Sequence, residues 1–235
     1  MQRIRLRYAK RGRLRFISHR DFSRAFERAL VRARVPVAYS SGFNPHPRIS
    51  YAGAAPTGAA SEAEYLEVGL AEEMDPERFR EVIDAALPAD LDVLEAAVSA
   101  GGSLADRLEA SVWRVTVPGL DAGAAEDAVR RFLEATEVPV ERMTKKGLRT
   151  FDCRAAVVSL STQAAPGSGD VCAILAMVLR HGTPAVRPDD VLAGLRDTAG
   201  LQAGAAPLHE RLAQGPLDAQ AGTVGDPLAP DRDTV

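Results

Sequence analysis

The chain has 235 residues, of which 46% are hydrophobic and 26% are charged, and this balance excludes an intrinsically disordered chain. The longest uninterrupted apolar run, residues 171–179, is too short to cross a bilayer as a helix. The basic N-terminus is followed by alternating residues rather than by the apolar stretch of a secretory signal. Cys153 and Cys172 form neither a disulfide framework nor a CxxC metal site. We therefore expect a cytoplasmic protein with no membrane span, cofactor or metal.

The net charge of −3 hides an uneven distribution along the sequence. Residues 1–50 contain 13 basic and 2 acidic residues, whereas the rest of the chain contains 16 basic and 30 acidic residues. Such a concentration of positive charge attracts polyanions, because binding releases counterions from a phosphate backbone. The alternative is that the basic and acidic parts neutralise each other across an internal interface.

The first predicted elements carry much of this positive charge. Residues 2–8 alternate between apolar residues and arginines, which predicts a half-buried strand with a cationic open face. Residues 14–17 are expected to be a short extended piece. A helix is predicted from Ser18, with Asp21 as a capping-box-like partner and an apolar face that begins at Phe22. Its arginines at i,i+4 spacing extend the cationic surface; they are Arg20, Arg24, Arg28 and Arg32.

The elements that follow complete a split βαβ order. We predict strands over 35–39, 49–52, 62–70 and 91–98, a rigid loop over 40–48, and a helix over 75–87. The loop contains two prolines, a glycine and an asparagine. This is the ferredoxin-like pattern, with two helices on one sheet face and the other face free to bind a partner. Glu62, Glu64 and Glu67 are expected on a solvated strand edge.

A second β-α-β-β-α-β order follows residue 101. Its predicted strands are 112–117, 138–143, 150–160, 171–179 and 208–212, and its helices are 122–137 and 187–196. Periodicity leaves a buried helix open for 171–179. Lys145 and Lys146 form a basic turn, and residues 163–170 form a loop of small residues. The sequence thus predicts an α+β fold of two tandem ferredoxin-like (split βαβ) halves with mostly antiparallel sheets: a basic half over 1–100, an acidic half over 101–213 and a disordered tail over 214–235.

Two histidines and one carboxylate are the candidates for chemistry. His19 lies in the first turn of the arginine-rich helix, and His46 lies between two prolines of the loop. Each is suited to flank a phosphate as a general acid or base. Asp21 is the third candidate, although helix capping also explains it. The sequence lacks the motifs of P-loop NTPases, dinucleotide-binding proteins, HExxH zinc proteases and GxSxG hydrolases.

Three stretches between Gly12 and Tyr65 carry a family resemblance. They are GRLRFISHxD at residues 12–21, YSSGFNPHPRIS at 39–50 and SEAEY at 61–65. Together they resemble the bacterial radical SAM-linked protein family, a domain of unknown function, except that Arg20 stands where an apolar residue is expected. The resemblance implies a cytoplasmic protein that occurs beside, or fused behind, a radical SAM enzyme. With only two distant cysteines, this chain lacks the three-cysteine cluster motif and would be the accessory partner.

These observations lead us to expect a non-catalytic accessory protein of a radical SAM enzyme that binds structured RNA, ribosomal or transfer RNA, through its basic half. Two alternatives stay open: a metal-independent endoribonuclease-like enzyme using His19 and His46, and a pure protein–protein adaptor. The lack of a catalytic motif favours a protein that is not an enzyme. The predicted RNA contacts are Arg3, Arg5, Arg7, Arg13, Arg20, Arg24, Arg28, Phe43, Asn44, His46 and Arg48.

Overall fold

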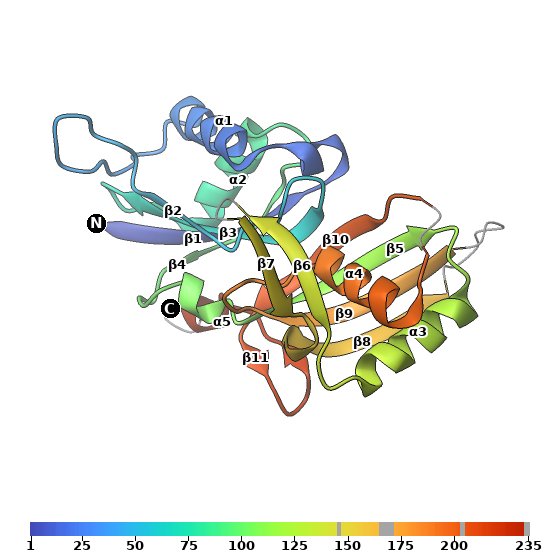
Figure 1. Cartoon of the computed structure of the whole chain (residues 1–235). Coiled ribbons are helices and arrows are strands. Elements are labelled where there is room, and N and C mark those ends of the chain that lie inside the picture. Colours follow the sequence, from blue (N-terminus) through green and yellow to red (C-terminus); the bar gives the residue numbers. More distant parts are fainter. Residues whose placement is uncertain (145–146, 165–171, 203–204, 233–235) are drawn as a thin grey trace. The chain divides into compact units, whose positions relative to one another are not determined.

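The computed structural model describes residues 1–144, 147–164, 172–202 and 205–232 (Figure 1). It has a mixed α+β fold whose strand pairs are antiparallel, which confirms the predicted class. The chain divides into two compact units. Unit 1 contains residues 1–108 and the C-terminal segment from Asp226, and unit 2 contains residues 109–225. The division thus falls at residue 108, and not at the predicted residue 100.

Unit 1 contains a four-stranded antiparallel sheet in the order β4-β1-β3-β2. Two central strands pair along their whole length, with Leu6 opposite Leu66 and Arg5 opposite Glu67. The elements are β1 (Gln2–Lys10), the 3-10 helix η1 (Gly12–Phe16), α1 (His19–Arg32), β2 (Ile49–Ala52), β3 (Ala60–Leu70), α2 (Pro76–Ala86), β4 (Val93–Val98), the 3-10 helix η2 (Ala105–Arg107) and α5 (Ala229–Arg232).

The main core of unit 1 lies between one face of this sheet and the two helices α1 and α2. The apolar residues of β1 face this core, as the alternation predicts, and the Tyr8 ring stacks on the Phe22 ring with 4.5 Å between centroids. Ser18 caps α1 by accepting a hydrogen bond from the Asp21 backbone N–H. The main core residues from these elements include Ile4, Leu6, Tyr8, Phe22, Phe26, Phe79 and Ile83.

Two predicted extended pieces of unit 1 differ in the structure. Residues 14–17 belong largely to η1, which turns the chain from β1 into α1. Residues 35–39 make only isolated bridges, Val37 with Leu70 and Tyr39 with Pro47, instead of a strand. Pro36 removes a backbone donor from this segment, which disfavours a continuous ladder.

The opposite face of this sheet is partly covered, in contrast to the predicted free face. Residues 101–108 and the C-terminal segment cover it, and Leu228 is completely buried there. The predicted disordered tail is corrected by the same finding, because residues 214–232 include the end of β10 (Leu208–Gly215), β11 (Leu217–Asp218), β12 (Thr223–Val224) and α5, and Asp231 is buried. A composition rich in glycine and proline did not reveal these anchors. This second small core consists of Ala52, Ala63, Tyr65, Leu104, Leu108 and Leu228.

Unit 2 contains another four-stranded antiparallel sheet in the order β10-β5-β9-β8. The predicted apolar run is strand β9 rather than a helix, and its burial alternates along the strand. The unit consists of β5 (Ala110–Pro118), α3 (Ala122–Glu134), β6 (Pro139–Thr144), β7 (Gly147–Asp152), η3 (Arg154–Ala156), β8 (Val157–Ala164), β9 (Cys172–Arg180), α4 (Pro188–Ala199), β10 (Leu208–Gly215), β11 (Leu217–Asp218) and β12 (Thr223–Val224).

Two smaller features complete unit 2. Strands β6 and β7 form a separate hairpin, so the predicted strand over 150–160 is interrupted at η3. Lys145 and Lys146, the predicted basic turn, and positions 165–170 of the predicted small-residue loop lie outside the described residues. In the part of the chain that the structure describes, none of the helices is both long and apolar enough to cross a membrane.

Candidate nucleic-acid interface

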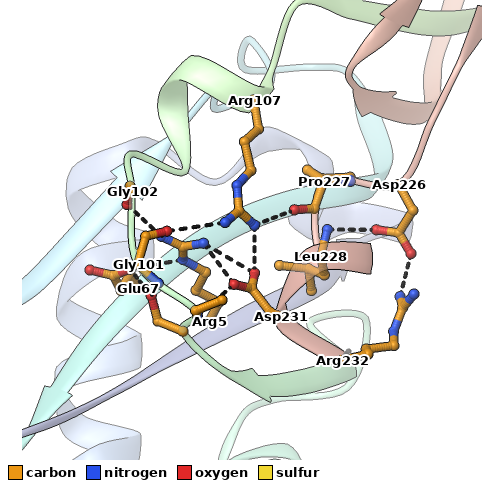
Figure 2. A network of polar contacts seen from close by, with 12 residues as sticks. Arg5, Glu67, Gly101, Gly102, Arg107, Asp226, Pro227, Leu228, Asp231 and Arg232 are labelled. Atoms are coloured by element: carbon orange, nitrogen blue, oxygen red, sulfur yellow. Dashed lines mark hydrogen bonds and ion pairs between the residues drawn. The ribbon is translucent and has the colours of Figure 1, made fainter. Parts of the chain in front are cut away.

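The arginines of β1 form internal ion pairs instead of an open cationic face, and Figure 2 shows those of Arg5. The Arg5 side chain is completely buried, and its Nε donates to Glu67 at 2.8 Å while its Nη1 donates to both carboxylate oxygens of Asp231 at 2.9 and 3.1 Å. Arg3 lies 3.3 Å from Glu67, and Arg7 lies 3.5 Å from Glu95. The prediction of Arg5 as an RNA contact is therefore wrong, because its guanidinium has no access to a phosphate.

The partners of these arginines come from neighbouring strands. Glu67 stands opposite Arg5 in the β1–β3 register, and Glu95 stands opposite Arg7 in the β1–β4 register. Opposite charges on neighbouring strands attract each other at paired and at diagonal positions, and Arg3 contacts Glu67 diagonally. Arg3 and Arg7, although partly exposed, therefore bring little uncompensated charge. Glu62 pairs with Arg11 in the same way, so the glutamates of β3 are not a merely solvated edge.

Most of the other basic residues of the first fifty lack a carboxylate partner. Arg11 pairs with Glu62 and Asp92, and Lys10 is buried with its Nζ 3.4 Å from two backbone carbonyls. Among the residues that the structure describes, no carboxylate lies within 4.0 Å of any of the remaining eight arginines. These eight are Arg13, Arg15, Arg20, Arg24, Arg28, Arg32, Arg34 and Arg48.

The arginines of α1 follow one exposed side of the helix. Arg20, Arg24 and Arg28 are successive i,i+4 neighbours, and like charges at this spacing repel each other by about 0.2–0.5 kcal/mol per pair. Asp21 does not offset them by an ion pair, because its carboxylate accepts a 2.6 Å hydrogen bond from the Ser18 hydroxyl. A row of repelling cations costs some helix stability and is relieved when an anion binds. This row is the centre of the basic surface, which we define as the exposed side of η1 and α1.

An exposed aromatic ring adjoins the basic surface on η1. Phe16 is 58% exposed, and the Arg15 guanidinium carbon lies 4.7 Å above the centroid of its ring. Arg13 is exposed on the same short helix. A ring with a guanidinium on one side is the combination that stacks on an unpaired base while neutralising a phosphate.

The loop over residues 40–48 has a fixed neck and an exposed tip. The backbone N–H of Ser40 donates to the His46 carbonyl at 2.8 Å, and the backbone N–H of His46 donates to the Ser40 hydroxyl at 3.0 Å. Arg48 Nε donates to the Tyr39 carbonyl at 3.2 Å. At the tip, the side chain of Phe43 is fully exposed and Asn44 is exposed beside it. Hydrogen bonds therefore hold the two ends of the loop together while Phe43 is exposed at its tip.

The two candidate catalytic histidines lie in different surroundings. The His19 ring packs edge-on against Tyr51, with 4.8 Å between centroids, on the side of the sheet that α1 covers. Burial raises the pKa of Tyr51. His46 lines a hollow together with Glu67 and Gly69, whose positions on β3 face the other side of the sheet. This placement does not favour a shared acid–base pair across one phosphate.

The described ranges contain no group of three or more histidine, cysteine, aspartate or glutamate side chains arranged to hold a metal ion. The arrangement thus offers cations, exposed rings and hydroxyls, and its chemistry is that of binding an anion.

Sequence reasoning missed Asp231 and Arg107 of the buried network, because no local pattern links them to Arg5.

The comparisons with known proteins place this architecture in a family. A family model described as "Uncharacterized protein conserved in bacteria (DUF2344)" matches residues 3–188, which is most of the chain. The chain belongs to this family. Membership confirms the predicted bacterial domain of unknown function, whereas the family description does not mention a radical SAM partner.

Other comparisons add little. No curated protein matches this chain. A solved structure titled "Crystal Structure of an Unknown Protein from Galdieria sulphuraria" aligns with 89% of this chain and 98% of its own, at 14% identity and a TM-score of 0.26. A TM-score this low does not bear on fold or function.

Proposed function

We propose that unit 1 binds structured RNA, ribosomal or transfer RNA, through the basic surface and the neighbouring loop over residues 40–48. The observation that carries this proposal is the contrast between two sets of arginines. Those of β1 have carboxylate partners, whereas Arg20, Arg24 and Arg28 on α1 have none within the described residues. A phosphate backbone is the partner that uses such a row most directly, because each contact releases a condensed counterion.

The exposed rings support RNA rather than an acidic protein. Phe16 is on η1, Tyr39 precedes the loop and Phe43 is at its tip, and all three are largely exposed. Stacking of an unpaired base on such a ring contributes about 1–3 kcal/mol by alanine substitution. RNA with unpaired loops offers both phosphates and accessible bases, whereas a rigid duplex offers few accessible bases.

The strand orders support the finer fold proposal of two ferredoxin-like halves. In unit 1 the order is β4-β1-β3-β2, with α1 after the first strand and α2 after the third. In unit 2 the order is β10-β5-β9-β8, with α3 after the first strand of that sheet and α4 after the third. The same relation of chain order to sheet order defines a split βαβ unit. The β6–β7 hairpin would then be an insertion in the second half.

The role as a cytoplasmic, non-catalytic accessory protein of a radical SAM enzyme rests on the resemblance of residues 12–65. The chain holds two cysteines that are far apart in sequence, and it therefore cannot supply a three-cysteine cluster of its own. In this proposal the chain holds the RNA, and the partner enzyme performs the chemistry.

The decisive experiment is a salt titration of binding to total bacterial RNA. The full chain is compared with a variant carrying Arg20→Gln, Arg24→Gln and Arg28→Gln. Each phosphate contact contributes about −0.7 to −0.9 to the slope of log affinity against log salt, so the slope should flatten by about 2–3 in this variant. A matched control carries Arg78→Gln, Arg130→Gln and Arg196→Gln, three exposed arginines that already pair with carboxylates. The control should keep the slope of the unmodified chain.

Weak binding with a flat slope would overturn the RNA proposal. Co-purification of the radical SAM enzyme that survives nuclease treatment would then favour the adaptor alternative. Cleavage of the bound RNA that disappears in His46→Ala while binding persists would instead favour the endoribonuclease alternative.

A further inference from the structure

A hollow of about 570 Å³ lies beneath the loop over residues 40–48. It is on the sheet face opposite α1 and α2, since Arg3, Glu67 and Ser50 occupy the register positions that point away from the main core. Its size falls within the range of about 300–1,000 Å³ that is usual for small-ligand sites. The polar side chains that line it are Arg3, Ser40, His46, Arg48, Ser50 and Glu67.

The floor of the hollow depends on a glycine. Gly69 lies on β3 opposite Arg3, and a Cβ added there would approach the Cβ of Arg48 to 3.2 Å. The Gly69 backbone N–H donates to the Arg48 carbonyl at 2.8 Å, and the Arg48 N–H donates to the Ala38 carbonyl at 2.8 Å. These bonds fix the base of the loop to β3, so the hollow exists before any ligand arrives.

The charge of the hollow favours an anion. Glu67 is the only carboxylate among the residues that line it, and its oxygens already accept hydrogen bonds from Arg3, Arg5 and the Ser99 hydroxyl. Within the described residues, Arg48 lies near no carboxylate, and about half of the Arg3 side chain remains exposed. His46 adds a ring that can donate from nitrogen, and two serines add hydroxyls.

We propose that this hollow binds the terminal phosphate of an RNA strand, that is, a phosphomonoester rather than an internal phosphodiester. The inference rests on the proposed function and specifies the substrate end that the protein recognises. A phosphomonoester carries a charge of about −1.5 to −2 at pH 7 and three acceptor oxygens, which the Arg48 guanidinium, the His46 ring and the two serine hydroxyls match better than they match a diester.

The location of the hollow fits this role. Because α1 covers the other side of the sheet, a strand that contacts Arg24 reaches the hollow by passing the β2 edge. The loop over residues 40–48 leads into β2, and the exposed Phe43 ring at its tip is available to stack on a base of the passing strand. The α1 row would then hold the body of the RNA and the hollow would hold its end.

The test uses one short, internally labelled RNA prepared with a 5′-phosphate, with a 3′-phosphate, or with hydroxyls at both ends. The full chain should bind one phosphorylated form about 10-fold more tightly than the hydroxyl form, as expected for charge-assisted hydrogen bonds. Arg48→Gln and His46→Gln should each bring the three affinities together. The matched control Arg24→Gln, on α1, should weaken all three by the same factor. Equal affinities for the three RNAs in the unmodified chain, or a preference that survives both hollow variants, would overturn the inference.

A second measurement separates failure of this inference from failure of the proposed function. If no RNA binds with a steep salt slope, the full chain is titrated with AMP and with inorganic phosphate while the imidazole NMR signals of His46 are followed. A shift of these signals with AMP, absent in Arg48→Gln, would retain the hollow as a nucleotide phosphate site. A response to inorganic phosphate alone, or no response at all, would overturn it.

Discussion

Replacement of Asp231 by alanine tests whether the C-terminal segment anchors unit 1. The carboxylate accepts two hydrogen bonds from Arg5, one from Arg107 at 2.8 Å and one from the Ala100 backbone N–H at 2.8 Å (Figure 2). Both Arg5 and Asp231 are completely buried. Removing one member of a buried ion pair costs about 3–5 kcal/mol, because the remaining charge is left without compensation.

The expected loss for Asp231→Ala lies at the lower end of this range. Arg5 keeps its bond to Glu67 and its Nη2 bonds to the carbonyls of Gly101 and Gly102, at 3.0 and 2.6 Å. We therefore expect a decrease of about 3 kcal/mol in the free energy of unfolding. In a protein of this length each kcal/mol lowers Tm by about 2–4 °C, so Tm should fall by about 6–12 °C.

Urea unfolding followed by circular dichroism measures this loss. The matched control is Asp197→Ala, which removes a carboxylate from an exposed ion pair with Arg196 and should cost no more than about 1 kcal/mol. Asp231→Asn should fall between the two variants, because the amide keeps an acceptor but loses the charge. If Asp231→Ala is no more destabilising than Asp197→Ala, the buried network does not anchor the segment and the reasoning fails.

Two further outcomes follow from exposure and burial. Phe43→Ala should change the free energy of unfolding by less than about 0.5 kcal/mol, because the ring is fully exposed, yet it should weaken RNA binding by about 1–3 kcal/mol. The control Met143→Ala, which removes an exposed apolar side chain of unit 2, should leave the RNA affinity unchanged. Equal effects of the two variants on the affinity would contradict a stacking role for Phe43. Burial raises the pKa of the Cys153 thiol to about 12, whereas Cys172 is only half-buried. Cys172 alone should therefore react with Ellman's reagent at pH 8 in the native chain, and both thiols should react after unfolding. In Cys172→Ser only the Cys153 thiol is left, so rapid reaction of this native variant would refute the prediction. Because the unfolded thiol ionises near pH 8.5, Cys153 should also make the protein less stable as pH rises from about 8.5 to 12.

Local patterns in the sequence predicted the elements whose causes are local. Helix α1 begins beside its predicted start, because Ser18 supplies its cap and the apolar residues from Phe22 repeat at helical spacing. The exposed loop with Phe43 follows from its prolines and glycine. The arginines of α1 were likewise found at their predicted exposed positions.

Features that depend on distant residues were not predictable in this way. Alternation alone cannot show whether Arg5 faces water or a carboxylate, and its partner Asp231 is 226 positions away. Composition suggested disorder after residue 214, although a few anchors such as Leu228 and Asp231 fold that segment. The charge count therefore selected the segment that contains the basic surface, but it also included Arg5, which takes no part in that surface.

The return of the C-terminal segment to unit 1 has a consequence for how the protein is made. Residues 109–225 form unit 2 and separate the two pieces of unit 1, so unit 1 is complete only after the segment from Asp226 has been synthesised. At about 5–20 residues per second, synthesis of this stretch takes roughly 6–24 s, during which Arg5 has Glu67 but not yet Asp231 as a partner. During translation the unit that contains the basic N-terminal residues is thus completed after unit 2, and a chain that stops before Asp231 has a defect at the fifth residue.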